Sequence, residues 1–132
     1  MASMILDPVT QRNLEAAPNQ PIYVINPSVF QVVGYYSPSD NIRSQLTLVY
    51  SRNEEMRNQH SDHLSLTAAN MRANGVRNVV PYESVSTHGT EHLFLLYHNR
   101  WDWTDRALAQ SHATITYLGP AFQGDLVSVR FP

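Results

Sequence analysis

One helical segment constrains the fold of this 132-residue chain more than any other feature of its sequence. Ser51 and Glu54 form a capping-box pattern at its start, where the serine oxygen and the glutamate can satisfy free backbone N–H groups. After this start, residues that would line one face of a helix recur at helical spacing. They continue until Asn74-Gly75, a pair typical of a helix C-terminus. The pattern predicts a helix over residues 53–74.

Strand-like segments surround this helix. Alternating or valine-rich segments predict a hairpin of strands 22–25 and 29–36 around the turn 26–28, then strands 45–50, 76–87, 112–118 and 125–131. Residues Glu91 to Trp103 fit either a helical stripe or a buried strand, and Gly89-Thr90-Glu91 resembles a helix start, which favours a second helix. This order of strands and helices along the chain predicts an α+β fold, in which two helices pack on one face of a single sheet.

The segments also suggest a simple domain organisation. Residues 1–20 carry two prolines and little periodicity, so we expect an N-terminal arm followed by a single domain over residues 21–132. Apolar residues on both sides of the strands predict that the second sheet face packs against another subunit. The sequence shows no membrane-spanning run and no signal-peptide pattern, so the expected location is cytoplasmic.

Composition excludes several kinds of chemistry. The chain has no lysine and no cysteine, so it cannot use a lysine Schiff base, a cysteine thiolate or a disulfide. Its nine arginines form no basic stripe, which argues against nucleic-acid binding. It has no glycine-rich phosphate loop and no dinucleotide-binding fingerprint, so we expect no cofactor. The expected ligand is a small organic molecule.

Two stretches of the chain resemble a known family. The first is Leu66-Thr67-Ala68-Ala69-Asn70-Met71-Arg72-Ala73-Asn74-Gly75 before Val79-Val80, and the second is Ser111 to Leu118 followed by Gly124-Asp125-Leu126-Val127-Ser128-Val129. They are similar to the helix, penultimate strand and final strand of the RidA/YjgF reactive-intermediate deaminase superfamily. The resemblance implies a chorismate-mutase-like homotrimer with an inner barrel and ligand clefts between subunits.

The resemblance also implies an enzyme of reactive intermediates, but this sequence departs from the family at both key positions. Family members hold the substrate carboxylate with an arginine and position water with a glutamate. Here Gln110 or His112 stands at the arginine position and Ser128 at the glutamate position. Arginine recognises a carboxylate through two parallel hydrogen bonds that histidine cannot form. The expected activity is therefore acid/base chemistry, such as hydrolysis, tautomerisation, dehydration or cyclisation, in place of the family's imine deamination.

The expected catalytic residues are His112, Glu83 and Ser128. His112 is the predicted proton-transfer group, because imidazole titrates near neutral pH, although a structural histidine at a strand end would fit its position equally well. Ligand binding is expected to involve side chains near the same cleft: Tyr35, Trp101, Arg106 and Thr114. Trp101 and Tyr35 belong to aromatic concentrations of a kind that more often fills a core or an interface.

Other interpretations of the sequence stay open. His60 with His63 and His88 with His92 have spacings that could supply two metal ligands each, but no carboxylate completes a recognised pattern, so no metal site is predicted. One alternative function is a non-catalytic ligand-binding trimer. Another is a hotdog-fold thioesterase or dehydratase, because residues 115–127 also resemble a hotdog strand pair, although the further strands that normally follow are absent from this chain.

Overall fold

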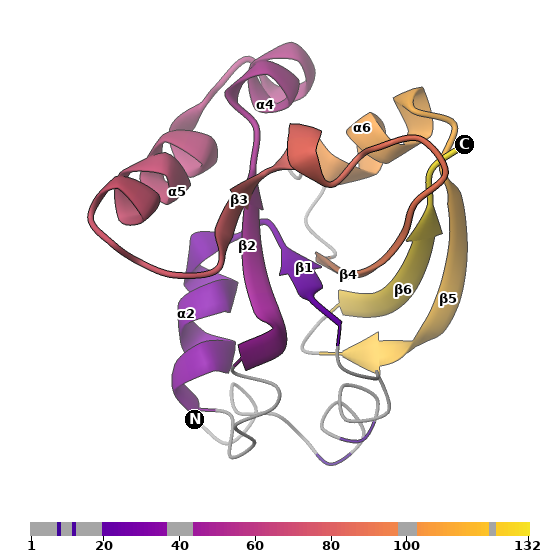
Figure 1. The fold of residues 1–132 in the computed structure, drawn as a ribbon, viewed down its shortest axis with the longest axis horizontal. Coiled ribbons are helices and arrows are strands. Elements are labelled where there is room, and N and C mark those ends of the chain that lie inside the picture. Colours follow the sequence, from indigo (N-terminus) through magenta and orange to yellow (C-terminus); the bar gives the residue numbers. More distant parts are fainter. Residues whose placement is uncertain (1–7, 9–11, 13–19, 37–43, 98–102, 122–123) are drawn as a thin grey trace.

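The computed structural model describes residues 8, 12, 20–36, 44–97, 103–121 and 124–132. Its centre is a six-stranded sheet in the order β3-β2-β1-β4-β6-β5 (Figure 1). Strands β1 to β4 are mutually parallel, whereas β6 pairs antiparallel with both β4 and β5. The strands are β1 Ile22–Val24, β2 Leu46–Tyr50, β3 Val79–Pro81, β4 Glu91–Tyr97, β5 Thr114–Ala121 and β6 Gly124–Arg130.

Helical segments cover both faces of this sheet. They are α2 Pro27–Tyr36, α4 Arg52–Gln59, α5 His63–Ala73, the 3₁₀ helix η2 Tyr82–Ser84 and α6 Trp103–Gln110. One hydrophobic cluster packs α2 and α5 against one face, and a second packs η2 and α6 against the other. Alternate residues of each central strand enter the two clusters, as strand geometry requires. The mixed α and β composition is as expected, but the placement of helices on one face only is wrong.

Residues 29–36 were expected to be the second strand of a hairpin, and this expectation is wrong because they belong to α2. The Asn26 side-chain oxygen accepts a hydrogen bond from the backbone N–H of Ser28 at 2.8 Å, and Pro27 occupies the first helical position. Asparagine before proline is a strong helix start, since proline has the helical φ and needs no hydrogen-bond acceptor there. The turn signal at residues 26–28 was therefore a helix cap.

The segment Glu91–Tyr97 is strand β4, so the expected helix over 91–103 is also wrong. It lies between β1 and β6 in the sheet, and the side chains of Leu93, Phe94 and Leu95 are buried. A strand that is covered on both faces needs a continuous apolar run instead of an alternating one. Helix α6 begins only at Trp103, where the expected helix was to end.

The long predicted helix is two helices with a break at residues 60–62. His60 adopts the left-handed conformation (φ 55°) and ends α4, and its backbone N–H bonds the carbonyl of Met56. The predicted C-terminus is close to the observed one, because α5 ends at Ala73. His60 and His63 are exposed, so they do not pack on the sheet as a continuous helix stripe would require.

Four of the expected strands are confirmed, and the last two pair antiparallel with each other. These are the segments at 22–25 and 45–50, and the pair β5–β6. The strand expected at 76–87 is limited to Val79–Pro81, after which η2 follows. The arm over residues 1–20 lies almost wholly outside the described residues. The expectation that the second sheet face is free to pack against another subunit is wrong, because η2 and α6 cover it. The trimer, its inner barrel and membership of the RidA/YjgF superfamily stay predictions.

Candidate functional site

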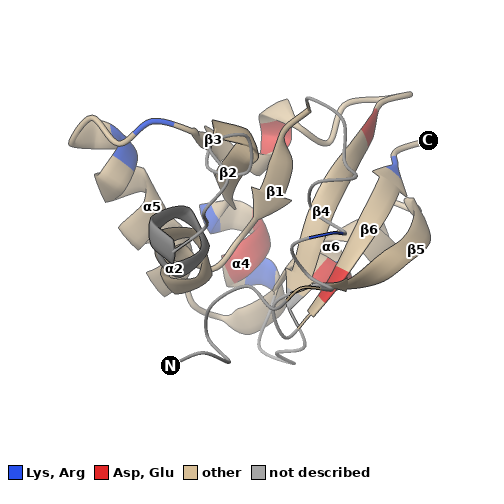
Figure 2. Cartoon of the chain, turned by 90° about the horizontal axis from the view of Figure 1, so that it is seen from below, with Lys and Arg blue, Asp and Glu red and all other residues tan. Residues whose placement is uncertain are grey.

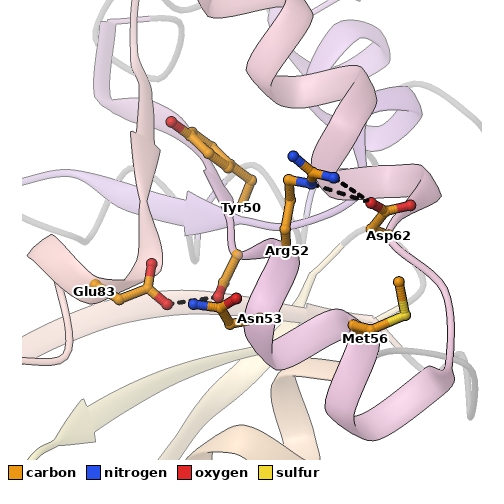
Figure 3. A pocket seen from close by; sticks show the side chains of 7 residues that line it. Tyr50, Arg52, Asn53, Met56, Asp62 and Glu83 are labelled. Atoms are coloured by element: carbon orange, nitrogen blue, oxygen red, sulfur yellow. Dashed lines mark hydrogen bonds and ion pairs between the residues drawn. The ribbon is translucent and has the colours of Figure 1, made fainter.

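A cleft lies where β2 and β3 end. Parallel strands present their carboxyl ends at one edge of a sheet, and ligands in open α/β sheets bind outside that edge. The cleft has a volume of about 400 Å³, within the range of small-molecule sites. We call it the Ser51–Glu83 cleft, and its lining is Tyr50, Ser51, Arg52, Asn53, Met56, Asp62 and Glu83 (Figure 3).

Ser51 is the buried anchor of the cleft. It follows β2 directly and caps α4, accepting a hydrogen bond on its hydroxyl oxygen from the backbone N–H of Glu54 at 3.1 Å. The same hydroxyl donates to the Glu83 carboxylate at 2.6 Å, a short charge-assisted bond. The Ser51 backbone N–H donates to the hydroxyl of Ser65 at 3.0 Å. These bonds fix the position of the Glu83 carboxylate relative to the start of α4.

Arg52 and Asp62 form an ion pair at the rim of the cleft. Two nitrogens of the guanidinium lie 3.0 and 3.1 Å from one Asp62 oxygen. The side chain of Arg52 is 62% exposed, so water screens this pair and its contribution to stability is under about 1 kcal/mol. The pairing balances the arginine charge with a carboxylate, and among the described residues of the lining Glu83 is the charged side chain without an ion pair.

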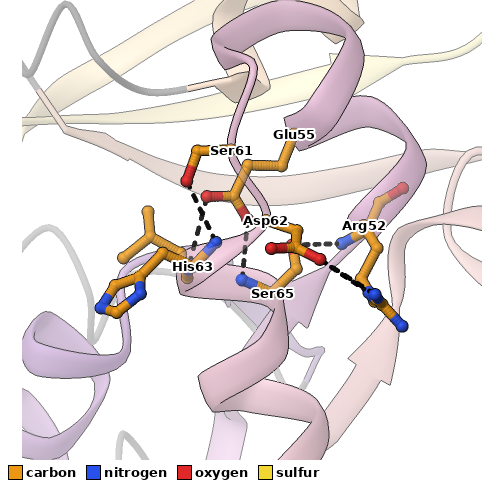
Figure 4. A network of polar contacts seen from close by, with 8 residues as sticks. Arg52, Glu55, Ser61, Asp62, His63 and Ser65 are labelled. Carbon is orange, nitrogen blue, oxygen red and sulfur yellow. Dashed lines mark hydrogen bonds and ion pairs between the residues drawn. The ribbon is translucent and has the colours of Figure 1, made fainter.

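A third carboxylate, that of Glu55, holds the two helices of this region together. Glu55, which is only 2% exposed, accepts hydrogen bonds from the backbone N–H groups of Leu64 at 3.1 Å and Ser65 at 2.7 Å (Figure 4). These N–H groups belong to the first turn of α5, where a negative charge also interacts favourably with the positive end of the helix dipole. Glu55 therefore has a structural role, and it keeps Ser65 in place to receive the Ser51 N–H.

Apolar atoms complete the cleft. Met56 is 48% exposed on α4, and Tyr50 is partly buried with its hydroxyl accepting a hydrogen bond from Arg72 at 3.3 Å. Burial raises the pKa of the phenol of Tyr82, which precedes Glu83 in η2. The arrangement offers a ligand one uncompensated carboxylate, a hydrogen-bonding serine and a hydrocarbon surface.

Of the three expected catalytic residues, Glu83 alone lines this cleft. His112 lies in the turn between α6 and β5, where it is exposed and adopts a positive φ of 57°. Ser128 lies on β6, and its hydroxyl donates to Glu91 at 2.7 Å. The structure thus gives Glu83 and Ser128 different hydrogen-bonding partners on different elements.

The expected binding residues also lie on separate elements. Arg106 of α6 donates a hydrogen bond to the backbone carbonyl of Asn58, which joins α6 to α4. Thr114 is exposed at the start of β5, opposite Arg130. Tyr35 is in α2, but its side chain lies outside the described part of the structure, as does all of Trp101.

In the sequence, Ser51 is recognisable only as a helix cap, and no pattern marks Arg52, Asn53 or Asp62 as site residues. The available signal was a strand followed at once by a capping serine. That signal points to a ligand site only when the strand belongs to a parallel sheet. Because 22–25 and 29–36 were expected to form an antiparallel hairpin, a parallel sheet was not expected.

Within the described ranges, no group of three or more histidine, aspartate or glutamate side chains is placed to hold a metal ion. None of the helices described there is long and apolar enough to cross a lipid bilayer. No family model, curated protein or solved structure matches this chain.

Proposed function

We propose that this protein binds a small organic amine or another compact organic cation in the Ser51–Glu83 cleft. The observation that carries the proposal is the Glu83 carboxylate, which is exposed at the cleft and fixed by the buried Ser51 hydroxyl at 2.6 Å. A preoriented carboxylate binds an ammonium group with less loss of side-chain entropy than a mobile one.

The charges of the lining support a cationic ligand. Arg52 and Asp62 neutralise each other, and the Ser51 hydroxyl that contacts Glu83 is neutral. The ligand would place its cationic group against Glu83, and its hydrocarbon part would contact Met56 and Tyr50. An anionic ligand would meet unfavourable charge at Glu83.

Acid/base chemistry on a bound intermediate is the finer part of the proposal. Glu83 is the group that would accept a proton from a C–H or O–H bond of the bound molecule, because a carboxylate within hydrogen-bonding reach of such a proton can act as a general base. This role replaces the one expected for His112. The non-catalytic alternative uses the same cleft without turnover.

An NMR titration with two matched probes tests the binding. Butylammonium chloride and sodium butyrate have similar hydrocarbon chains and opposite charges. We expect butylammonium to shift the amide signals of Ser51, Asn53 and Glu83 in a saturable manner, and butyrate to shift them much less. The Glu83→Gln variant should lose the butylammonium response by about tenfold in affinity, the effect of losing roughly 1.4 kcal/mol of charge interaction.

Glu91→Gln is the matched control. Glu91 also accepts a serine hydroxyl hydrogen bond, from Ser128 at 2.7 Å, but it lies on β4 and outside the cleft. This variant should bind butylammonium as the unmodified protein does. Equal binding by the Glu83→Gln variant, or equal responses to both probes, would contradict the proposal.

A further inference from the structure

The outer edge of β5 is a feature of the described sheet that the proposed function does not use. β5 is eight residues long and pairs only with β6 among the described strands (Figure 2). Three of its apolar side chains are strongly exposed: Ile115 by 44%, Tyr117 by 59% and Leu118 by 49%. A long edge strand presents unpaired backbone N–H and C=O groups that another strand can bind.

β5 lacks the charged side chains that usually prevent such pairing. No charged residue occurs from Ala113 to Gln123, and Figure 2 shows the strand free of charge colouring. Its proline, Pro120, stands near the end of the strand, and its bulge falls between Tyr117 and Gly119. The opposite edge, β3, has three residues and ends at Pro81, so it offers a much shorter pairing surface.

The side-chain pattern of β5 is complementary to itself. We propose that two copies of this chain form a two-fold dimer in which β5 pairs antiparallel with β5 of the second copy, with Thr116 on the axis. Ile115 of each copy then lies opposite Tyr117 of the other, and Thr116 lies opposite its own mate. β-Branched with aromatic and threonine with threonine are both favourable cross-strand pairs.

The two faces of β5 agree with this register. Ile115 and Tyr117 lie opposite Val129 and Val127 of β6, which belong to the hydrophobic cluster on the α6 face. Dimer formation would extend that apolar surface across the axis. Thr116 lies opposite Ser128 on the other face of the sheet, which Ser128 shares with Leu126 of the first hydrophobic cluster. A two-fold axis also places like residues near each other, so a strand without charge suffers no repulsion.

Single-cysteine cross-linking tests the register directly, because the chain contains no cysteine of its own. Directly opposed residues in an antiparallel pair have Cα atoms about 4.5 to 5.5 Å apart, within the range of a disulfide. With oxidised glutathione as the oxidant, we expect Thr116→Cys to form a covalent dimer rapidly. Leu66→Cys, which places an exposed cysteine on α5, should cross-link far more slowly.

Light scattering after size-exclusion chromatography gives the second readout. The unmodified protein should have twice the monomer mass, and Thr116→Lys should be monomeric with an unchanged circular dichroism spectrum. Mixing Thr116→Lys with Thr116→Glu should restore a dimer. A monomeric or trimeric unmodified protein, a dimeric Thr116→Lys variant, or equal cross-linking at positions 66 and 116 would overturn the proposal.

Discussion

His92 is a half-buried histidine in a cluster of aromatic rings. Its ring lies 5.4 Å from that of Tyr23, in a T-shaped arrangement, and 6.2 Å from that of Phe131. Its Nε2 atom has no hydrogen-bond partner among the described residues. Burial lowers the pKa of His92, and a hydrogen bond with the backbone of Val85 opposes that shift only in part.

This lowered pKa predicts a loss of stability in weak acid. Below about pH 6.5, the ordinary pKa of histidine, the unfolded chain takes up a proton at His92 that the folded chain does not. The free energy of unfolding should therefore decrease as the pH falls from about 7.5 to 5.5, a range above most carboxylate titration. Urea denaturation at several pH values measures the slope. His92→Phe, which cannot take up the proton, should reduce it.

His63→Gln is the control for this prediction, because His63 is exposed on α5. Its pH slope should equal that of the unmodified protein. An unchanged slope in His92→Phe would show that other groups cause the pH dependence.

At the scale of elements, the break between α4 and α5 positions the candidate site. It brings Asp62 to Arg52, and it places the first turn of α5 against Glu55. The chain achieves the break by putting His60 in the left-handed conformation, which costs a residue with a Cβ about 1 kcal/mol or more. Glycine adopts this conformation without that cost and is the residue preferred there.

The substitution His60→Gly is therefore expected to stabilise the protein by about 0.5 to 1 kcal/mol, after allowing for the greater freedom of glycine in the unfolded chain. A glycine introduced three residues earlier should have the opposite effect. Arg57→Gly places glycine inside α4 and should destabilise by about 1 kcal/mol. Urea denaturation measures both values. Destabilisation by His60→Gly would mean that its side chain contributes more than its backbone strain costs.

At the scale of the whole molecule, the sheet has a protected centre and unequal edges. β1 and β4 lie inside the sheet, and Ile22 and Phe94 are fully buried in the two opposite clusters. β3 is a short edge strand that begins at Val79, and Val80 is only partly buried. Local opening is easiest where few buried contacts must be broken.

Native-state hydrogen exchange should follow this order. The hydrogen-bonded amides of β1 and β4 should exchange slowest, with opening free energies close to that of global unfolding. The hydrogen-bonded amides of β3 should exchange at least about tenfold faster, because an edge strand opens without disrupting the centre. Slower exchange in β3 than in β1 would show that the two hydrophobic clusters do not form the stable centre of the fold.

The candidate site was predictable only in part. Glu83 was identified as an acid near a cleft, and Ser51 as a helix cap, but nothing local to either residue joins them. The bond between their side chains links residues 32 positions apart. It depends on β2 and β3 lying side by side in parallel, which brings the residues that follow both strands to one edge. The pairing of these two strands is a property of the tertiary structure and cannot be inferred from the residues near Ser51 or Glu83.

The sequence by itself determined the elements whose signals are local. Strands β2, β5 and β6, the cap at Ser51 and the end of α5 near Asn74-Gly75 all follow from the local patterns and backbone preferences of neighbouring residues. Only the tertiary structure decided that 91–97 is a strand, that α2 crosses between parallel strands, and that both sheet faces are covered. An apolar run buried on two sides has no period of its own, so its partners determine its conformation.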